Sequence, residues 1–174
     1  MTIASRRGVL VLLVGMITAW TAPIEGGPTQ GTPASTPPRQ VLFLCPHGAA
    51  KSVLASTYFR QLAKERGLNV LVTFAGTEPD AVVAPVVAAH LTRQGLAAPT
   101  SAPRKVTAQD LAQADLVVSL GCDLAGLPKP KGTLRTWDEI PSPSANFAAA
   151  DDAIRSRVLA LVDELARQAT PAKP

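Results

Sequence analysis

An apolar run ends at a cysteine, and a loop of small residues then leads into a helical pattern. The run is Val41–Leu44, Cys45 follows it directly, and a helix is expected to begin near Lys51. The small side chains between them leave the backbone N–H groups uncovered. Those amides and the positive end of the helix dipole both attract negative charge. This order of strand, loop and helix therefore predicts an oxyanion-binding loop around Cys45.

The same electric field would favour the nucleophilic thiolate of Cys45. The alternative is that Cys45 is a buried small residue at a strand end, the commonest place for a lone cysteine. If the loop binds an oxyanion, its contacts would come from Pro46, His47, Gly48, Ala49, Ala50 and Lys51.

The first 22 residues resemble an export signal. Arg6 and Arg7 form a positive start, Gly8–Ala19 is apolar, and small residues follow at 19–22. The stretch Ser5–Leu10 is also similar to a twin-arginine signal. We expect a periplasmic or secreted protein. The alternative is an uncleaved N-terminal anchor, the one case in which a membrane contact is expected.

A second segment, residues 23–39, is rich in Pro, Gly, Thr and Ser and is predicted to be a linker. Residues 40–169 are expected to form the folded domain, and residues 170–174 a short tail.

Strand and helix patterns alternate through the domain. The strands are predicted at Val41–Leu44, Asn69–Ala75, Leu116–Leu120 and Gly132–Thr136, and the helices at Ser52–Arg66, Ala84–Gln94, 107–114 and Ala148–Ala169. Only 4% of the residues are aromatic, whereas 47% are hydrophobic, so the core is built from small aliphatic side chains. This pattern predicts an α/β three-layer sandwich, with helices on both faces of a four-stranded parallel sheet.

Charge and residue spacing disfavour several kinds of partner. The net charge is +4, and it falls to +2 without Arg6 and Arg7, so no nucleic-acid partner is expected. No spacing of His, Cys, Asp and Glu matches a metal site, and no nucleotide-binding loop is present, so no cofactor is expected. His90 falls in an apolar helical pattern and is expected to be structural.

The domain combines the Cys45 loop, with its basic residue and serine, with Ala75-Gly76-Thr77, Gly121-Cys122-Asp123, and Trp137 followed by 140–143. In these features it resembles the low molecular weight protein tyrosine phosphatase superfamily, which includes thiol-linked arsenate reductases. The resemblance implies that Cys45 is the nucleophile, Ser52 supports its thiolate, and the ligand is phosphate, arsenate or a phosphorylated substrate.

Two positions depart from the family pattern. Lys51 occupies the place of an arginine that clamps the oxyanion, and an ammonium lacks the planar fork of a guanidinium. Ser142 precedes Pro143 where the family has an aspartate, its general acid. Because serine cannot protonate a leaving group near neutral pH, the acid must be Asp138, Glu139 or absent, and Asp138 is the preferred candidate. Asp138 could equally be a solvated turn residue.

Cys122 lies in a turn that resembles the one carrying a resolving cysteine in arsenate reductases. The resemblance then allows a Cys45–Cys122 disulfide and an external thiol donor. An oxidising compartment would favour that disulfide but would supply a reductase with few thiol donors. Cys122 could instead be a buried small residue. The leading hypothesis is a phosphomonoester hydrolase that works through a phosphocysteine. The alternatives are an arsenate reductase-like oxidoreductase and a non-catalytic oxyanion binder.

Overall fold

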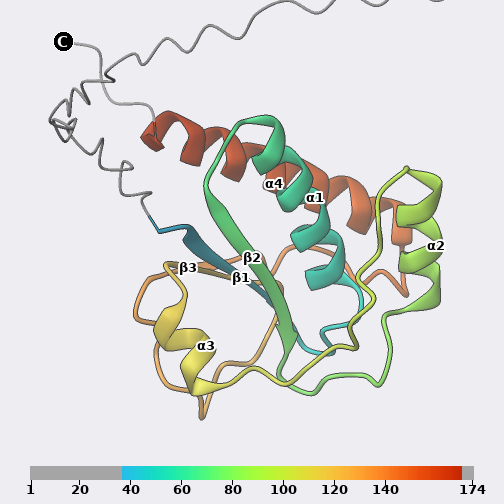
Figure 1. Ribbon diagram of the computed structural model, residues 1–174. Helices are drawn as coiled ribbons and strands as arrows, with labels where there is room; N and C mark the ends of the chain where they lie inside the picture. The colour runs from blue at the N-terminus through green and yellow to red at the C-terminus, as the bar shows by residue number, and fades with distance from the viewer. Residues whose placement is uncertain (1–36, 170–174) are drawn as a thin grey trace, which may run out of the picture. The chain divides into compact units, whose positions relative to one another are not determined.

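The computed structural model describes residues 37–169, in which strands and helices alternate along the chain (Figure 1). The strands are β1 (Arg39–Cys45), β2 (Val70–Gly76), β3 (Leu116–Ser119) and β4 (Thr133–Thr136). The helices are α1 (Lys51–Glu65), α2 (Pro85–Arg93), α3 (Ala108–Gln113) and α4 (Phe147–Ala169). Each predicted element is present, with its ends within one or two residues of those expected.

The strands form one parallel sheet in the order β2-β1-β3-β4. β1 pairs with both β2 and β3, and its last five residues are buried. In the β1–β2 register Cys45 lies opposite Gly76. The carboxyl ends of β1, β2 and β3 therefore meet at one edge of the sheet, which is where α/β proteins bind ligands.

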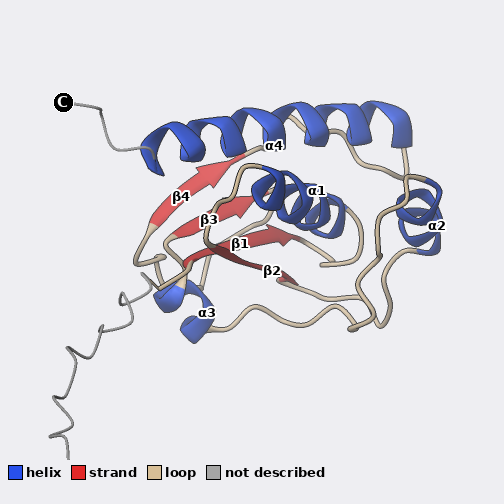
Figure 2. Cartoon of the chain, turned by 45° about the horizontal axis from the view of Figure 1, so that its top comes forward, coloured by secondary structure: helices blue, strands red, loops and turns tan. Residues whose placement is uncertain are grey.

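Helices cover both faces of the sheet, as Figure 2 shows for α1 and α4 on one side and α3 on the other. Alternate residues of β1 separate the two layers, since Val41 and Phe43 pack with α1, α2 and α4, whereas Leu42 and Leu44 pack with α3. The predicted three-layer α/β sandwich is confirmed.

Local sequence signals account for the ends of the elements. Thr107 caps α3 through a capping box, in which its side chain and that of Asp110 bond each other's backbone N–H groups. Pro85 begins α2, a position that needs no backbone N–H. β1 begins at Arg39, so the predicted linker ends one residue earlier than expected.

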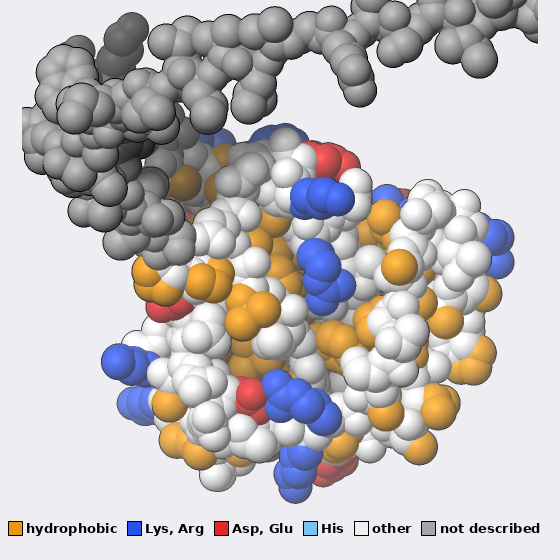
Figure 3. All heavy atoms as spheres, viewed as in Figure 1, with side chains coloured by type: hydrophobic (Ala, Val, Ile, Leu, Met, Phe, Trp, Pro, Cys, Tyr) orange, Lys and Arg blue, Asp and Glu red, His pale blue; other side chains and the backbone are white. Residues whose placement is uncertain are grey.

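None of the helices within residues 37–169 is both long and apolar enough to cross a membrane. The predicted export signal, most of the linker and the tail lie outside the described residues. On the face drawn in Figure 3, hydrophobic surface lies between separated Lys and Arg side chains. Large hydrophobic side chains are exposed at Leu71, Val82, Val86, Leu134 and Leu159.

Candidate functional site

The loop after β1 turns its carbonyl groups away from the helix that follows it. The carbonyl oxygens of Pro46, His47 and Ala49 accept backbone hydrogen bonds of 2.8 to 3.0 Å from the segment 78–84. These bonds fix the outer side of the loop to the chain that connects β2 with α2. The opposite side of the loop then carries the N–H groups.

Several of these N–H groups have no protein acceptor. Within residues 37–169, no hydrogen bond from the backbone N–H of Ala49, Ala50, Lys51 or Ser52 to another group is present. Helix α1 begins at Lys51 with no side-chain cap and no acidic residue in its first turn. Unpaired amides at the start of a 15-residue helix form a site that favours an anion. The predicted anion-binding geometry is therefore consistent with the local backbone.

The thiol of Cys45 lies at the base of this loop. Cys45 is 3% exposed, and its Sγ donates a hydrogen bond of 3.1 Å to Oγ of Ser52, which is fully buried. When the thiol is ionised, the hydroxyl of Ser52 becomes the donor and stabilises the thiolate. The pairing of Cys45 with Ser52 is the contact that the sequence resemblance implied.

Two glycines allow the loop to lie directly on the end of β2. Gly48 has a φ of 62°, in the left-handed region, and its N–H bonds the carbonyl of Cys45 at 3.3 Å. A Cβ added to Gly76 would lie 2.6 Å from the nitrogen of Gly48, closer than atoms can approach. Gly76 is thus a positioning residue of the loop, a role that its place in a Gly-Thr turn after a strand did not reveal.

Lys51 extends from the first residue of α1 toward two turns at the same sheet edge. Its Nζ lies 3.5 Å from the carbonyl oxygen of Ile140, a long hydrogen bond. It would also lie 3.2 Å from a Cβ at Gly121, and its charge offsets part of the rise that burial causes in the pKa of the Cys122 thiol. Lys51 therefore lies beside Gly121 and within electrostatic range of Cys122.

Cys122 and Cys45 are both free thiols. The pKa of the Cys122 thiol is raised to about 11, mainly by burial and in smaller part by the charge of Cys45, whereas the hydrogen bond with Ser119 and the charge of Lys51 act in the opposite direction. The N–H of Cys122 also donates to Oγ of Ser119 at 3.2 Å. The structure thus brings the predicted Cys45, Ser52, Lys51 and Cys122 to one edge, together with Ser119, which the sequence did not single out.

The carboxylates near Trp137 differ in their surroundings. Trp137 is buried against Phe43, with 6.1 Å between ring centroids. Glu139 forms a 2.6 Å ion pair with Arg157. Asp138 is exposed. Its role as an acid stays a prediction.

Ser142, which stands at the family's acid position, hydrogen-bonds the hydroxyl of Ser144 at 2.7 Å. Its carbonyl accepts the N–H groups of residues 145 and 146, just before α4. Ser142 therefore belongs to the turn that leads into α4.

His47 points to the outer side of the loop. Its Nδ1 lies 3.3 Å from the carbonyl oxygen of Glu78 and 3.6 Å from a carboxylate oxygen of Asp80, and its side chain is 63% exposed. The ring contacts the segment after β2 rather than the sulfur. Within residues 37–169, no group of three or more His, Cys, Asp and Glu could hold a metal ion.

His90 belongs to a polar cluster away from the loop. Its Nε2 lies 3.1 Å from a carboxylate oxygen of Asp151, which also accepts a hydrogen bond from the hydroxyl of Tyr58. Arg155 donates to Asp151 at 3.0 Å and stacks 4.1 Å above the ring of Tyr58. Burial, together with Asp151, raises the pKa of Tyr58 above its usual range. The cluster joins α1, α2 and α4, so His90 has the structural environment that was expected.

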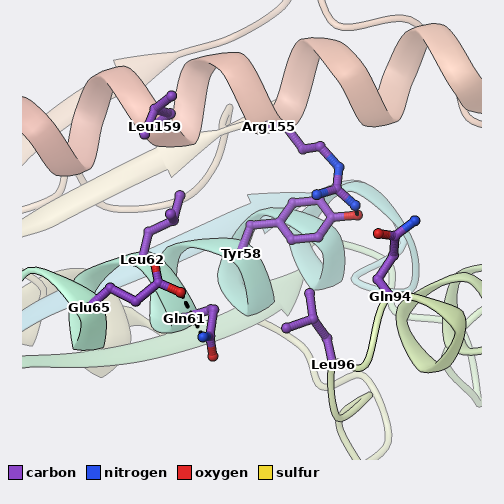
Figure 4. A pocket seen from close by; sticks show the side chains of 8 residues that line it. All are labelled: Tyr58, Gln61, Leu62, Glu65, Gln94, Leu96, Arg155 and Leu159. Atoms are coloured by element: carbon purple, nitrogen blue, oxygen red, sulfur yellow. Dashed lines mark hydrogen bonds between the residues drawn. The ribbon is translucent and has the colours of Figure 1, made fainter.

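A groove of about 440 Å³ lies beside this cluster. Figure 4 shows Tyr58 and Arg155 facing each other along it, with a hydrogen bond between Gln61 and Glu65 on α1. None of its eight lining residues belongs to the Cys45 loop. The groove is thus separate from the candidate site.

Comparison with known proteins places this chain in a family. Residues 40–170 match the low molecular weight phosphotyrosine protein phosphatases, so the chain belongs to this family. The predicted resemblance is confirmed. No curated protein sequence matches the chain significantly.

Solved structures of two kinds share the fold. A thioredoxin-dependent arsenate reductase of Corynebacterium glutamicum is 25% identical with a TM-score of 0.65, and the match covers 78% of this chain and 65% of that enzyme. An arsenate reductase of Archaeoglobus fulgidus is 29% identical with a TM-score of 0.58, and the match covers 71% and 98%. A low molecular weight phosphotyrosine phosphatase of Vibrio cholerae is 24% identical with a TM-score of 0.65 over 76% and 99%, a likeness of fold alone.

Proposed function

We propose that this protein is a phosphatase that hydrolyses phosphomonoesters through a phosphocysteine at Cys45. The main support is the buried pairing of Cys45 with Ser52 beneath four unpaired N–H groups. Such amides stabilise an oxyanion best as negative charge develops on it, which is how an enzyme lowers the barrier for phosphoryl transfer. Membership of the phosphatase family supports the same reaction.

The proposed reaction has two steps. In the first, the Cys45 thiolate attacks phosphorus, a P–S bond forms and the P–O bond to the leaving group breaks, while Asp138 gives its proton to the departing oxygen. In the second, water attacks the phosphocysteine, and phosphate and the thiolate are released. Lys51 and the loop amides neutralise the phosphoryl oxygens in both steps.

Hydrolysis of p-nitrophenyl phosphate by the purified protein and by a Cys45→Ser variant tests this proposal. The proposal predicts turnover that the serine variant lacks, since its hydroxyl is not ionised at neutral pH. Equal rates in the two proteins would contradict it. Binding of phosphate measured by calorimetry without any turnover would support a non-catalytic oxyanion binder instead.

A second candidate function is arsenate reduction. It is favoured by the position of Cys122, which lies close enough to Cys45 for a charge on Cys45 to affect the pKa of the Cys122 thiol. The thiolate of Cys45 would first form an S–As bond with arsenate. The thiolate of Cys122 would then attack Sγ of Cys45, so that a Cys45–Cys122 disulfide forms, the S–As bond breaks and As(V) leaves as As(III). An external thiol donor would have to reduce that disulfide. Arsenate-dependent consumption of NADPH in a glutaredoxin-coupled assay, lost in Cys122→Ser, would support this function, and its absence would remove it.

We further propose that residues 1–22 direct export, so that the enzyme works in the periplasm or outside the cell. The support is the sequence pattern of two arginines, an apolar run and small residues. A reporter that is active only outside the cytoplasm, fused after residue 39, should be active. Replacement of Arg6 and Arg7 by lysine should abolish that activity if the signal is of the twin-arginine type.

A further inference from the structure

The side chain of Lys51 ends against the backbone of two turns. Its Nζ lies 3.5 Å from the carbonyl oxygen of Ile140. It also lies 3.2 Å from a Cβ built on Gly121 and, apart from Gly121 and its two chain neighbours, is the only heavy atom of the described residues within 4 Å of that Cβ. We call these two backbone contacts the Lys51 seat. One turn follows β3 and the other follows β4, so the seat forms where the carboxyl ends of the strands meet.

Gly121 meets two requirements at this point. Its φ of 79° lies in the left-handed region, which side chains other than glycine adopt at a cost. It also lacks the Cβ that would press on the ammonium. Gly126, five residues later, has nearly the same φ of 81°, but a Cβ there would meet nothing within 4 Å. Backbone conformation alone would explain a glycine at both positions, whereas contact with Lys51 distinguishes Gly121.

An ammonium on a flexible stem needs such a seat more than a guanidinium does. Lysine carries three rotatable donors and no planar fork, so its charge is not oriented by its own geometry. The Ile140 carbonyl takes one N–H and leaves two for a ligand. A charge held in place before the ligand arrives binds more strongly than one that must be ordered on binding.

We propose that Gly121 and the Ile140 carbonyl position the Lys51 ammonium for an oxyanion held above Cys45, and that residue 121 thereby determines oxyanion affinity. This proposal rests on the proposed function in one respect, because it takes the ligand of Cys45 as the ligand of Lys51. It assigns Gly121 a positioning role and no part in the chemical steps.

The test compares Gly121→Ala with Gly126→Ala. Both variants carry the same left-handed strain, but only the first presses on Nζ of Lys51. Orthovanadate, a tetrahedral oxyanion that resembles phosphate, is the probe, and calorimetry measures its binding. We expect binding to weaken at least about threefold in Gly121→Ala, because misplaced charge stabilises an oxyanion less. Gly126→Ala should bind as the wild type does.

A Lys51→Met background then separates contact with Lys51 from other effects of the turn. With the ammonium gone, Gly121→Ala and Gly126→Ala should bind vanadate equally. The effects of changing Gly121 and Lys51 are then not additive, as expected for two residues in contact. Two results would overturn the proposal. One is equal binding by the two alanine variants when Lys51 is present, and the other is a Gly121→Ala defect that persists without Lys51.

A second readout separates failure of this proposal from failure of the proposed function. If the wild type binds no vanadate, the proposed function is contradicted. The reactivity of Cys122 then tests separately whether Gly121 and the Ile140 carbonyl position the Lys51 ammonium. In a Cys45→Ser background, Lys51→Met should slow alkylation of Cys122 by iodoacetamide, because Lys51 favours its thiolate. Gly121→Ala should slow it at least about threefold relative to Gly126→Ala, and only while Lys51 is present. No difference would reject the seat.

Discussion

Gly76→Ala is expected to displace the oxyanion-binding loop without unfolding the sheet. Gly76 itself cannot move easily, because its N–H bonds the carbonyl of Arg104 at 3.0 Å and its carbonyl accepts the N–H of Val106 at 2.9 Å. The added Cβ would lie 2.6 Å from the nitrogen of Gly48 and 2.9 Å from the carbonyl oxygen of Pro46. The loop must therefore give way.

The size of the displacement follows from these distances. To bring the Cβ of an alanine at position 76 from 2.6 Å to the 3.0–3.4 Å that tight contacts allow, the loop must move by about 0.4 to 0.8 Å. A misplacement of 1 Å can cost about a hundredfold in rate, so we expect kcat/KM for p-nitrophenyl phosphate to fall by about tenfold to a hundredfold. Vanadate binding should weaken in parallel.

Gly67→Ala is the matched control. Gly67 has a φ of 66°, and a Cβ there would meet nothing within 4 Å, so this variant should lose about 1 kcal/mol of stability while keeping its activity. If Gly76→Ala keeps its activity within twofold of the wild type, the inferred close packing of the loop on β2 is wrong. The same conclusion follows if both variants lose activity equally.

Three further predictions concern other contacts. Asp151→Asn should lower the free energy of unfolding, measured by urea denaturation, by about 2 kcal/mol, because the buried side chain loses charge-assisted hydrogen bonds. The control is Asp152→Asn at the exposed neighbouring position, which should alter that free energy by less than about 0.5 kcal/mol. In Cys45→Ser, alkylation of Cys122 should keep accelerating as pH rises above about 9, because burial favours the neutral thiol even without the charge of Cys45, and a plateau at or below pH 9 would contradict this. Ser52→Ala should lower kcat for p-nitrophenyl phosphate about tenfold through loss of a donor to the thiolate, while an unchanged kcat would exclude that role.

The fold could be predicted because local patterns and global topology agree. β1 is apolar and ends at a loop of small residues, and Thr107 with Asp110 marks the start of a short helix. Alternating strands and helices leave few arrangements other than a parallel sheet with two covered faces. The place of Cys45 at the carboxyl end of β1 followed from the same patterns.

The remaining features depend on contacts between distant segments. Gly76 and Gly121 are glycines in turns by sequence, and only the three-dimensional structure shows that one touches the loop backbone and the other touches Lys51. The groups that surround Cys122 come from separate elements as well. The hydrophobic repeat along one strand or helix does not predict such contacts, because they depend on where the ends of different strands lie relative to one another.

The proposed oxyanion site above Cys45 is tested most directly by the alkylation of that thiol. In a Cys122→Ser variant, iodoacetamide reports Cys45 alone, and its rate can be measured with and without vanadate. We predict that saturating vanadate slows the alkylation of Cys45 at least about tenfold, as expected for a ligand that covers the sulfur. A rate that vanadate leaves unchanged would contradict the existence of the site.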